Sequence, residues 1–354
     1  MDKTINVGLI GFGAAGQVFH APVITSVAGL RLHRVTARRP EQRELLSQRY
    51  PGALPAQHVE EIILADDVDL VVVATSNDVH YTLTKAALQR GKHVVVEKPF
   101  TIISAQADEL IALAKEKDRL LTVHHNARWN SDYLTVKKVI ESGRLGRLVS
   151  FEARYDRFRN TLKENAWRED DLPGSGILYD LGAHLIDQSI QLFGMPEAVN
   201  ADLRKQRTGA RAVDDFELIL HYPRLKVSLK GAMLVKEPSP RYALYGESGA
   251  FVKYGIDPQE AALKAGKSPK GDPDWGREPR EIWGKLNISE NGREHIEYVA
   301  SEKGDYPAFY KNVYQAINGQ NEMQVKPEQA RDVIRIIELA QRSWDERRTI
   351  DLRL

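Results

Sequence analysis

An apolar segment from Ile5 to Ile10 runs directly into a glycine-rich turn, and this junction restricts the fold more than any other feature of the sequence. The turn has the pattern Gly-x-Gly-x-x-Gly and consists of Gly11, Phe12, Gly13, Ala14, Ala15 and Gly16. In a strand–turn–helix unit, the first glycine permits the tight turn, the second lets the backbone approach a pyrophosphate, and the third allows close helix packing. The helix N-terminus then offers N–H donors to the phosphates. The junction therefore predicts a Rossmann unit that binds a dinucleotide.

The first 123 residues alternate short apolar runs with helical segments. Runs that are apolar throughout indicate strands buried on both faces, and therefore a parallel sheet between helices. We expect strands at Ile5 to Ile10, Leu30 to Thr36, Val68 to Ala74, His93 to Val96 and Leu120 to Val123. We expect helices at Pro22 to Val27, Glu41 to Arg49, Thr82 to Gln89 and Ala105 to Lys117. This is the α/β pattern of a doubly wound sheet, and we assign residues 1–123 to a dinucleotide-binding domain.

After residue 123 the sequence changes to longer segments in which apolar and polar residues alternate, which is typical of antiparallel strands. We expect such strands at Leu148 to Phe158, Phe216 to Tyr222 and Lys226 to Met233. Helical spacing appears at Ser131 to Glu141, Gly176 to Phe193 and Glu328 to Arg342, whereas Lys264 to Arg280 is polar enough for a long surface loop. Residues 124–354 are therefore predicted to form an α+β domain with a large, mostly antiparallel open sheet.

The composition narrows the choice of partner. Fifty basic and 49 acidic residues give a net charge of +1, which provides no electrostatic support for binding nucleic acid or a membrane surface. The chain has no cysteine, which excludes disulfides, thiolate nucleophiles and cysteine-ligated metals. No apolar run approaches the ~20 residues of a membrane helix, and the first residues do not resemble a signal peptide. We expect a cytoplasmic protein whose partner is a small molecule.

The end of the second predicted strand bears on the choice of cofactor. NAD-binding Rossmann units usually place an acidic residue there for the ribose hydroxyls, but this chain has Ala37, followed by Arg38 and Arg39. A guanidinium at this place can pair with the 2′-phosphate of NADP. We therefore expect NADP in preference to NAD, with a solvated surface turn as the alternative reading of the two arginines.

Three further motifs carry a resemblance that extends over nearly the whole chain. They are Ala74-Thr75-Ser76-Asn77 with His80, Glu97-Lys98-Pro99, and the run from Gly174 to Asp187, which contains Asp180-Leu181-Gly182-Ala183-His184. Together they resemble the glucose-fructose oxidoreductase/inositol dehydrogenase (Gfo/Idh/MocA) family, in which proline is usual where Ser76 stands. Phe19-His20-Ala21-Pro22, Asn126-Ala127-Arg128-Trp129 and Trp167-Arg168-Glu169 are most similar to its NADP-dependent scyllo-inositol dehydrogenase-like members.

The resemblance implies that Lys98, Asp180 and His184 form a catalytic set. The pattern is compatible with this, because Lys98 lies just past the carboxyl end of a predicted parallel strand, and Asp180 and His184 share a helix face. We assign His184 as the proton acceptor from a substrate hydroxyl, Lys98 as a hydrogen-bond donor to the developing alkoxide, and Asp180 as an orienting charge. Lys98 as the acid/base is an open alternative.

The resemblance also implies the remaining binding residues. Further cofactor contacts are expected from Thr75, Ser76, Asn77, His80, Glu97, Lys98, Asn126, Trp167 and Arg168, and a cis peptide bond before Pro99. Substrate contacts are assigned to Arg128, Asp156, Asp180 and His184; packing at a domain interface is the alternative for Asn126, Arg128, Trp167 and Arg168. Which face of Leu148 to Phe158 lines the substrate cleft stays open. We expect no metal, because adjacent His124 and His125 point apart and the sequence shows no matching ligand cluster.

The expected function is an NADP-dependent dehydrogenase or reductase of a secondary alcohol or ketone in a polyol, inositol or sugar. NAD is the alternative cofactor. A non-catalytic cofactor-binding or sugar-binding regulatory protein is the alternative function, but such a protein would ordinarily lack Lys98 or His184. Relatives commonly pair through the open face of the second sheet, so we expect a homodimer or homotetramer.

Overall fold

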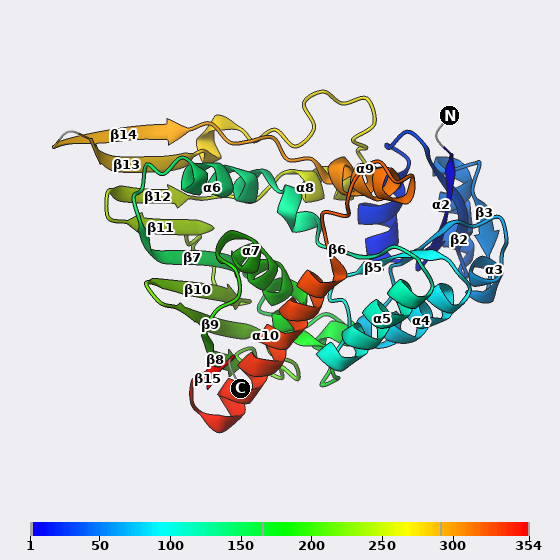
Figure 1. The fold of residues 1–354 in the computed structure, drawn as a ribbon, viewed down its shortest axis with the longest axis horizontal. Coiled ribbons are helices and arrows are strands. Elements are labelled where there is room, and N and C mark those ends of the chain that lie inside the picture. The colour runs from blue at the N-terminus through cyan, green and yellow to red at the C-terminus, as the bar shows by residue number, and fades with distance from the viewer. Residues whose placement is uncertain (1–2, 165, 291, 353–354) are drawn as a thin grey trace. The chain divides into compact units, whose positions relative to one another are not determined.

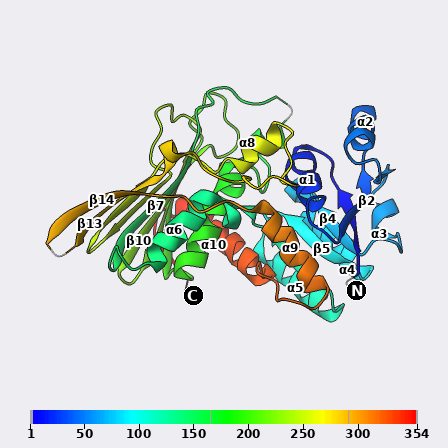
Figure 2. The same ribbon diagram turned by 90° about the horizontal axis from the view of Figure 1, so that it is seen from above.

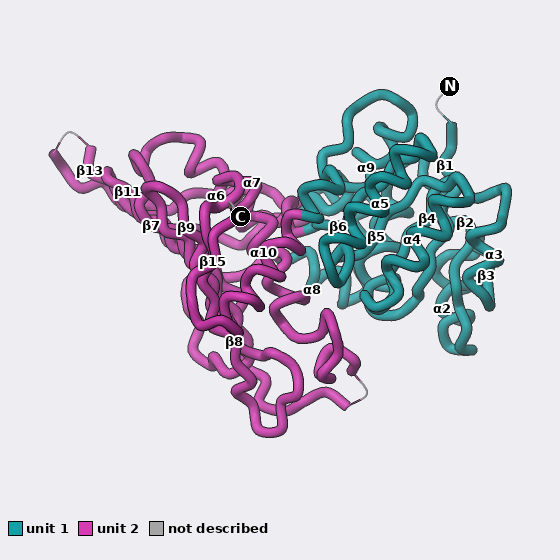
Figure 3. Tube along the Cα trace, turned by 60° about the horizontal axis from the view of Figure 1, so that its bottom comes forward, with its two compact units in different colours: residues 1–126, 258–275, 305–331 teal, residues 127–257, 276–304, 332–354 magenta. Residues whose placement is uncertain are grey.

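The computed structural model describes residues 3–164, 166–290 and 292–352. The chain forms two compact units, each assembled from three stretches of sequence (Figure 3). Unit 1 contains residues 1–126, 258–275 and 305–331, and unit 2 contains residues 127–257, 276–304 and 332–354. The sequence-based division at residue 123 includes neither of the two later stretches of unit 1. The described helices include none that is both long enough and apolar enough to cross a membrane.

Unit 1 contains a six-stranded sheet in which every strand pair is parallel (Figure 1). The strand order β3-β2-β1-β4-β5-β6 reverses direction between β1 and β4, as in a doubly wound sheet. The fold class predicted for this part of the chain is therefore confirmed. The strands are β1 (Ile5–Ile10), β2 (Leu30–Thr36), β3 (Leu54–Ala56), β4 (Leu70–Val73), β5 (His93–Glu97) and β6 (Leu121–His124).

Helices connect these strands, and two further helices enter unit 1 from late in the sequence. A π-helical turn, η1 (Gly16–His20), follows the glycine turn, where a regular helix was expected only from Pro22. The remaining elements are α1 (Ala21–Ile24), α2 (Pro40–Arg49), α3 (Glu60–Ile63), η2 (Asn77–Val79), α4 (His80–Gln89), α5 (Ser104–Glu116), α8 (Gln259–Lys264) and α9 (Tyr306–Ile317).

Unit 2 contains a nine-stranded sheet with the order β14-β13-β12-β11-β7-β10-β9-β8-β15. Among the strand pairs formed by the described residues, only β7–β10 is parallel, which confirms the predicted open and mostly antiparallel sheet. The strands are β7 (Leu148–Asp156), β8 (Ala198–Arg204), β9 (Asp215–Tyr222), β10 (Leu225–Ala232), β11 (Tyr242–Gly246), β12 (Gly249–Lys253), β13 (Gly284–Glu290), β14 (Arg293–Val299) and β15 (Ile350–Asp351).

Helices pack on one face of this second sheet (Figure 2). The ring of Phe193, at the end of α7 (Ala183–Phe193), lies 5.1 Å from that of Phe151 on β7, and Ser343 of α10 (Pro327–Glu346) accepts a hydrogen bond from the Ala201 amide on β8. The burial of β7 alternates accordingly, since its residues Phe151, Ala153 and Tyr155 are buried. The other elements are η3 (Asn126–Trp129), α6 (Ser131–Glu141), η4 (Trp167–Glu169), η5 (Leu178–Gly182) and η6 (Arg280–Ile282).

The polar stretch predicted as a surface loop does lack regular structure between α8 and η6, but it is not wholly at the surface. Trp275 and Glu278 are both 5% exposed. The Trp275 indole donates a 2.8 Å hydrogen bond to Gln259. The Glu278 carboxylate accepts a 2.6 Å hydrogen bond from the Lys253 ammonium. Polar residues in this stretch are thus buried because partners from distant segments satisfy them.

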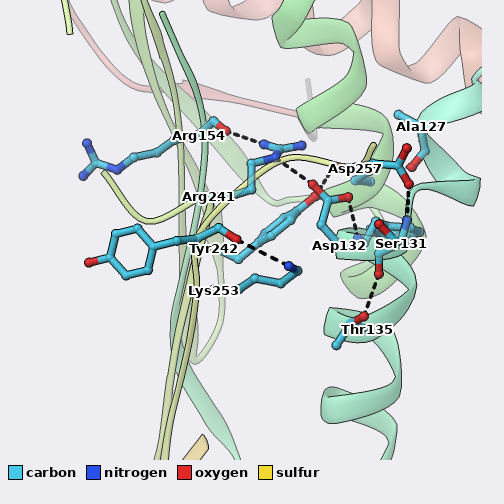
Figure 4. A network of polar contacts seen from close by, with 12 residues as sticks. Ala127, Ser131, Asp132, Thr135, Arg154, Arg241, Tyr242, Lys253 and Asp257 are labelled. Atoms are coloured by element: carbon cyan, nitrogen blue, oxygen red, sulfur yellow. Dashed lines mark hydrogen bonds and ion pairs between the residues drawn. The ribbon is translucent and has the colours of Figure 1, made fainter. Parts of the chain in front are cut away.

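Buried polar contacts hold α6 to the sheet of unit 2 (Figure 4). Asp132 on α6 accepts a 3.1 Å hydrogen bond from Arg241, and the Ser131 amide donates to Asp257 at 2.7 Å. Glu278 accepts a hydrogen bond from the Ser131 hydroxyl and another from the Lys253 ammonium, and both charged side chains are fully buried. Since a buried charge without a partner is costly, this ion pair is a sensitive point of the fold.

We predict that Glu278→Gln lowers the free energy of unfolding by about 3–5 kcal/mol, because the Lys253 ammonium stays buried without a countercharge. Unfolding in urea measures the change. Glu260→Gln is the control, since Glu260 forms an exposed pair with Lys264 one helical turn away, and this change should have far less effect. Equal effects of the two substitutions would contradict this reading of the buried pair.

Candidate active site

The glycine turn between β1 and η1 is defined by two close backbone approaches and one open position. Gly11 has a φ of +104°, and a Cβ at this residue would lie 2.3 Å from the Ala74 carbonyl oxygen. A Cβ at Gly16 would lie 2.0 Å from the carbonyl oxygen of Gly11. Gly13, by contrast, has no atom within 4 Å of its Cβ position. Two glycines thus allow the fold, while the third leaves space beside the backbone.

Neighbouring side chains hold this turn in place. The Gly11 amide donates to Thr36 Oγ1 at 2.7 Å, and the Phe12 carbonyl accepts hydrogen bonds from Gln17 and Gln42, both at 2.8 Å. Gln42 was not a predicted site residue, because glutamine one turn into a helix has no distinctive signal. The open space at Gly13 and the helical start at Gly16 fit a pyrophosphate, so the turn has the structure that a dinucleotide requires.

The segment after β2 carries the arginines expected to select the cofactor. Ala37 is buried, whereas Arg38 and Arg39 are exposed. Arg39 lies 3.2 Å from Glu41, and the Arg43 guanidinium donates to the carbonyl oxygens of Ala37 and Arg38, both at 3.0 Å. Arg43, which sequence reasoning missed, therefore adds a third cation to this segment.

The segment after β4 is joined to the segment that carries Lys98. Asn77 is almost fully buried, and Thr75 donates to the Ser76 carbonyl at 3.2 Å. His80 is also buried; its Nδ1 donates to the Pro99 carbonyl oxygen at 2.8 Å, and its Nε2 lies 3.4 Å from the Thr75 carbonyl oxygen. Its contact with Pro99 fixes one segment against the other. The peptide bond between Lys98 and Pro99 is cis, as the resemblance implied.

Glu97, the residue before Lys98, lies in a cluster that the sequence did not predict. Its Oε1 lies 2.9 Å from Nε2 of His20 and 2.8 Å from Nδ1 of His124, and the other ring nitrogen of His20 lies 2.5 Å from the Tyr310 hydroxyl. The expectation that His124 has no matching ligand-type neighbours is therefore wrong: its partners are 27 and 104 positions away in sequence, and His20, Glu97 and His124 lie close enough together to hold a metal ion.

The burial of this cluster changes how its members titrate. Burial lowers the pKa of His20 to about 4, assisted by the nearby His124 and opposed by the hydrogen bond to Glu97. Burial alone would raise the pKa of Glu97, but hydrogen bonds from His124 and His20 hold it well below its usual range. Burial raises the pKa of the Tyr310 hydroxyl well above its usual range. At neutral pH the cluster therefore contains an anionic Glu97, a neutral His20 and a protonated Tyr310.

In unit 2, three of the predicted residues lie together. Asp180 is part of the π-helical turn η5, and its Oδ1 lies 3.5 Å from Nε of Arg168. The Arg168 guanidinium also lies 4.4 Å from the ring centre of Trp167. The structure thus joins Asp180 to the Trp167–Arg168 pair, which the sequence placed in separate motifs.

His184, in the first turn of α7, lies beside a stacked pair that sequence reasoning missed. The ring centres of Tyr155, on β7, and His184 lie 6.1 Å apart. The Arg241 guanidinium stacks on the same tyrosine, 3.6 Å from the centre of its ring. Since Tyr155 belongs to the buried face of β7, that face is the one next to His184. Neither an isolated tyrosine nor an isolated arginine carried a signal in the sequence.

The other predicted substrate residues, Arg128 and Asp156, come from η3 and from the end of β7. Arg128 forms a bidentate pair with Asp187, at 2.8 and 2.6 Å, in which both side chains are largely buried. Asp156 ends β7 on the face opposite Tyr155, and burial raises the pKa of its carboxyl group, opposed by the nearby Arg154. Asn126 begins η3 and is 9% exposed.

The doubly wound sheet and its glycine turn define unit 1 as a dinucleotide-binding Rossmann unit. The chain therefore belongs to the class of proteins that bind a dinucleotide. Comparison with known proteins gives the family. Residues 5–125 match the description "Oxidoreductase family, NAD-binding Rossmann fold", and residues 137–352 match "Oxidoreductase family, C-terminal alpha/beta domain". The chain belongs to the Gfo/Idh/MocA oxidoreductase family, as the sequence motifs indicated.

Individual relatives match over their full length. The chain is 42% identical to the oxidoreductase YdgJ of Escherichia coli, covering 99% of this chain and 100% of that protein. It is 39% identical to the scyllo-inositol 2-dehydrogenase (NADP⁺) IolW of Bacillus subtilis, covering 99% and 96%. Among solved structures, the oxidoreductase YvaA of Bacillus subtilis has a TM-score of 0.95 at 39% identity, with 99% of each chain covered.

We predict that Gly13→Ala weakens cofactor binding at least about tenfold without lowering thermal stability, because the added methyl group enters space that only the cofactor needs. Gly16→Ala should instead destabilise the fold, since its Cβ would collide with the Gly11 carbonyl. Calorimetric titration and thermal unfolding separate the two effects. Gly52→Ala is the control, because its Cβ position is also open and lies outside the turn. Undiminished cofactor binding by Gly13→Ala would show that the pyrophosphate lies elsewhere.

Proposed function

We propose that this oxidoreductase uses NADP to oxidise a secondary alcohol, or to reduce the matching ketone, in a polyol, inositol or sugar. The observation that carries the proposal is the joint presence of Lys98 after β5 and of the Asp180–His184 pair before and within α7, in a chain of this family. The name of the relative IolW, a scyllo-inositol 2-dehydrogenase, supports the substrate class.

The proposed chemistry assigns one task to each residue of the set. NADP, when bound, would accept the hydride that leaves the carbinol carbon. Oxidation of an alcohol also requires removal of the hydroxyl proton, and His184 is our proton acceptor because an imidazole titrates near neutral pH. The Lys98 ammonium would donate a hydrogen bond to the oxygen as negative charge develops there. Asp180, held near Arg168, would orient the substrate hydroxyl. Lys98 as the acid/base is the alternative within the same set.

The preference for NADP rests on the segment after β2. It contains Ala37 where an acidic residue would contact the ribose hydroxyls of NAD, followed by two exposed arginines. Arg43 lies close enough to donate to the backbone of both Ala37 and Arg38. The relative IolW is named as NADP-dependent. A positively charged segment of this kind suits the 2′-phosphate.

The remaining assignments belong to the same proposal. Cofactor contacts are assigned to residues 11–16, Arg38, Arg39, Thr75, Ser76, Asn77, His80, Glu97, Lys98, Asn126, Trp167 and Arg168. Substrate contacts are assigned to Arg128, Asp156, Asp180 and His184. We further propose that residues 1–123 serve the cofactor, that residues 124–354 serve substrate and oligomer contacts, and that the protein works in the cytoplasm as a homodimer or homotetramer.

We predict that Lys98→Ala and His184→Ala each reduce kcat/KM by about 10²–10⁴-fold, the usual effect of removing a positioned acid/base or donor. A panel of inositols, polyols and aldoses with NADP, followed by absorbance of the reduced cofactor, identifies the substrate and measures the loss. Lys115→Ala and His58→Ala are matched controls, because both residues are exposed and lie away from the motifs. Wild-type rates in both test variants would refute the catalytic set.

Cofactor choice has a separate test in Arg38→Ala. We expect the KM for NADP to rise at least about tenfold while the KM for NAD changes little, because only NADP carries the 2′-phosphate. Arg90→Ala, an exposed arginine at the end of α4, is the control. An equal rise of both KM values would remove Arg38 from the selection of the cofactor.

A further inference from the structure

The cluster of Tyr310, His20, Glu97 and His124 lies wholly in unit 1, and Glu97, assigned above as a cofactor contact, is its one member with a role in the proposed function. Its four members come from four elements: Tyr310 from α9, His20 from η1, Glu97 from β5 and His124 from β6. His20, His124 and Tyr310 are each at most 1% exposed, and Glu97 is 7% exposed. A buried carboxylate anion is costly, so the contacts of Glu97 require an explanation.

The distances assign a proton to every contact. Glu97 Oε1 is the common acceptor, so Nε2–H of His20 and Nδ1–H of His124 both donate to it. His20 is then neutral with an unprotonated Nδ1, and this nitrogen accepts the hydrogen bond from the Tyr310 hydroxyl at 2.5 Å. Both ring nitrogens of His20 are thereby used. The result is a directed chain of hydrogen bonds that ends on Glu97.

A metal site is the competing explanation, because two histidines and a glutamate are common ligands. In that case the atoms facing one another would be unprotonated. The Glu97 contacts of 2.8 and 2.9 Å instead have the length of N–H···O hydrogen bonds. Each contact in the cluster can be assigned one donor and one acceptor without a metal ion. We therefore interpret the cluster as a hydrogen-bond network.

The network links two parts of the dinucleotide-binding unit. η1 begins at Gly16, the last glycine of the phosphate turn, and ends at His20. β5 ends at Glu97, and Lys98 follows directly. The His20–Glu97 contact therefore fixes the helix that starts at the turn against the strand end that carries the lysine. The His80–Pro99 hydrogen bond adds a second attachment on the other side of Lys98.

We propose that His20, His124 and Tyr310 are positioning residues, which hold the Lys98 segment in a fixed place relative to the phosphate turn and hence to the bound dinucleotide. This inference rests on the proposed function of Lys98. The groups that face His20 are the anionic Glu97, together with His124, His80 and the Tyr310 hydroxyl. The positioning acts through geometry, since a displacement near 1 Å at a reacting group is enough to slow catalysis strongly.

The first test is Tyr310→Phe, which removes one hydroxyl group and keeps the aromatic ring. We expect kcat to fall about tenfold while the KM values for NADP and substrate stay within about twofold, because binding groups are unchanged and only Lys98 is misplaced. His20→Gln should have the same signature with a larger loss of kcat. Tyr298→Phe, at a tyrosine that is 62% exposed, is the matched control. A role in stability alone would lower the melting temperature and leave kcat unchanged.

Hydrogen exchange with and without NADP gives a readout that does not depend on turnover. In the wild type, NADP should slow amide exchange at residues 13–20 and also at residues 97–101. In Tyr310→Phe and His20→Gln, residues 13–20 should still respond, whereas the slowing at residues 97–101 should fall by about tenfold. An unchanged response at residues 97–101 in both variants would overturn the proposal.

Two outcomes separate this inference from its alternatives. If the wild type turns over no substrate of the panel, the proposed function fails, but the exchange experiment still decides whether the network joins the two segments. Metal analysis of the purified wild type and of His20→Gln addresses the competing explanation. One equivalent of zinc or iron per chain in the wild type, lost in the variant, would overturn the hydrogen-bond interpretation.

Discussion

The close approach of backbone to backbone in the glycine turn is the constraint on which unit 1 depends. A side chain at Gly11 would collide with the end of β4, and one at Gly16 would collide with Gly11 itself. Both positions must therefore be glycine, because β1 pairs with β4 and η1 begins only five residues after Gly11. The same arrangement leaves Gly13 open, so the requirement for a tight turn also creates the space for a pyrophosphate. Fold and cofactor binding follow from one piece of geometry.

Unit 2 places its candidate residues by a different means, which is burial of polar pairs. Asp187 on α7 forms an ion pair with Arg128, and Asp132 on α6 forms one with Arg241. Each helix thus has a buried aspartate whose charge is balanced by an arginine. Arg241 also stacks on Tyr155, the residue beside His184. Tyr155, a neighbour of the first turn of α7, is thus itself held by a partner. Such support suits the proton transfer that we propose for His184, because the efficiency of that step depends on a constant geometry.

The sequence predicted features that depend on local pattern and missed features that depend on distant contacts. β1 and β2 were predicted residue for residue, because β1 is mostly apolar up to the glycine turn and β2 has Leu and Val at intervals between Gly29 and Ala37. β3 was missed since it has only three residues and includes Pro55, and β14, at one edge of the second sheet, was missed since it is mostly charged and exposed. The Lys98, Asp180 and His184 set came from motifs. The Glu97 network could not be predicted, because His20 and Tyr310 are 290 positions apart and bonded only in the folded unit. That residues 258–275 and 305–331 belong to unit 1 could not be predicted either, because this too depends on contacts between distant parts of the sequence.

The central claim is that this chain transfers a hydride between a carbinol carbon and NADP. Its most direct test uses an inositol or polyol deuterated at the carbinol carbons, with mass spectrometry of the NADPH that forms. We predict that each NADPH gains one deuterium in the wild type and that Lys98→Ala forms product far more slowly. NADPH without deuterium, or no reduced cofactor with any member of the substrate class, would contradict it.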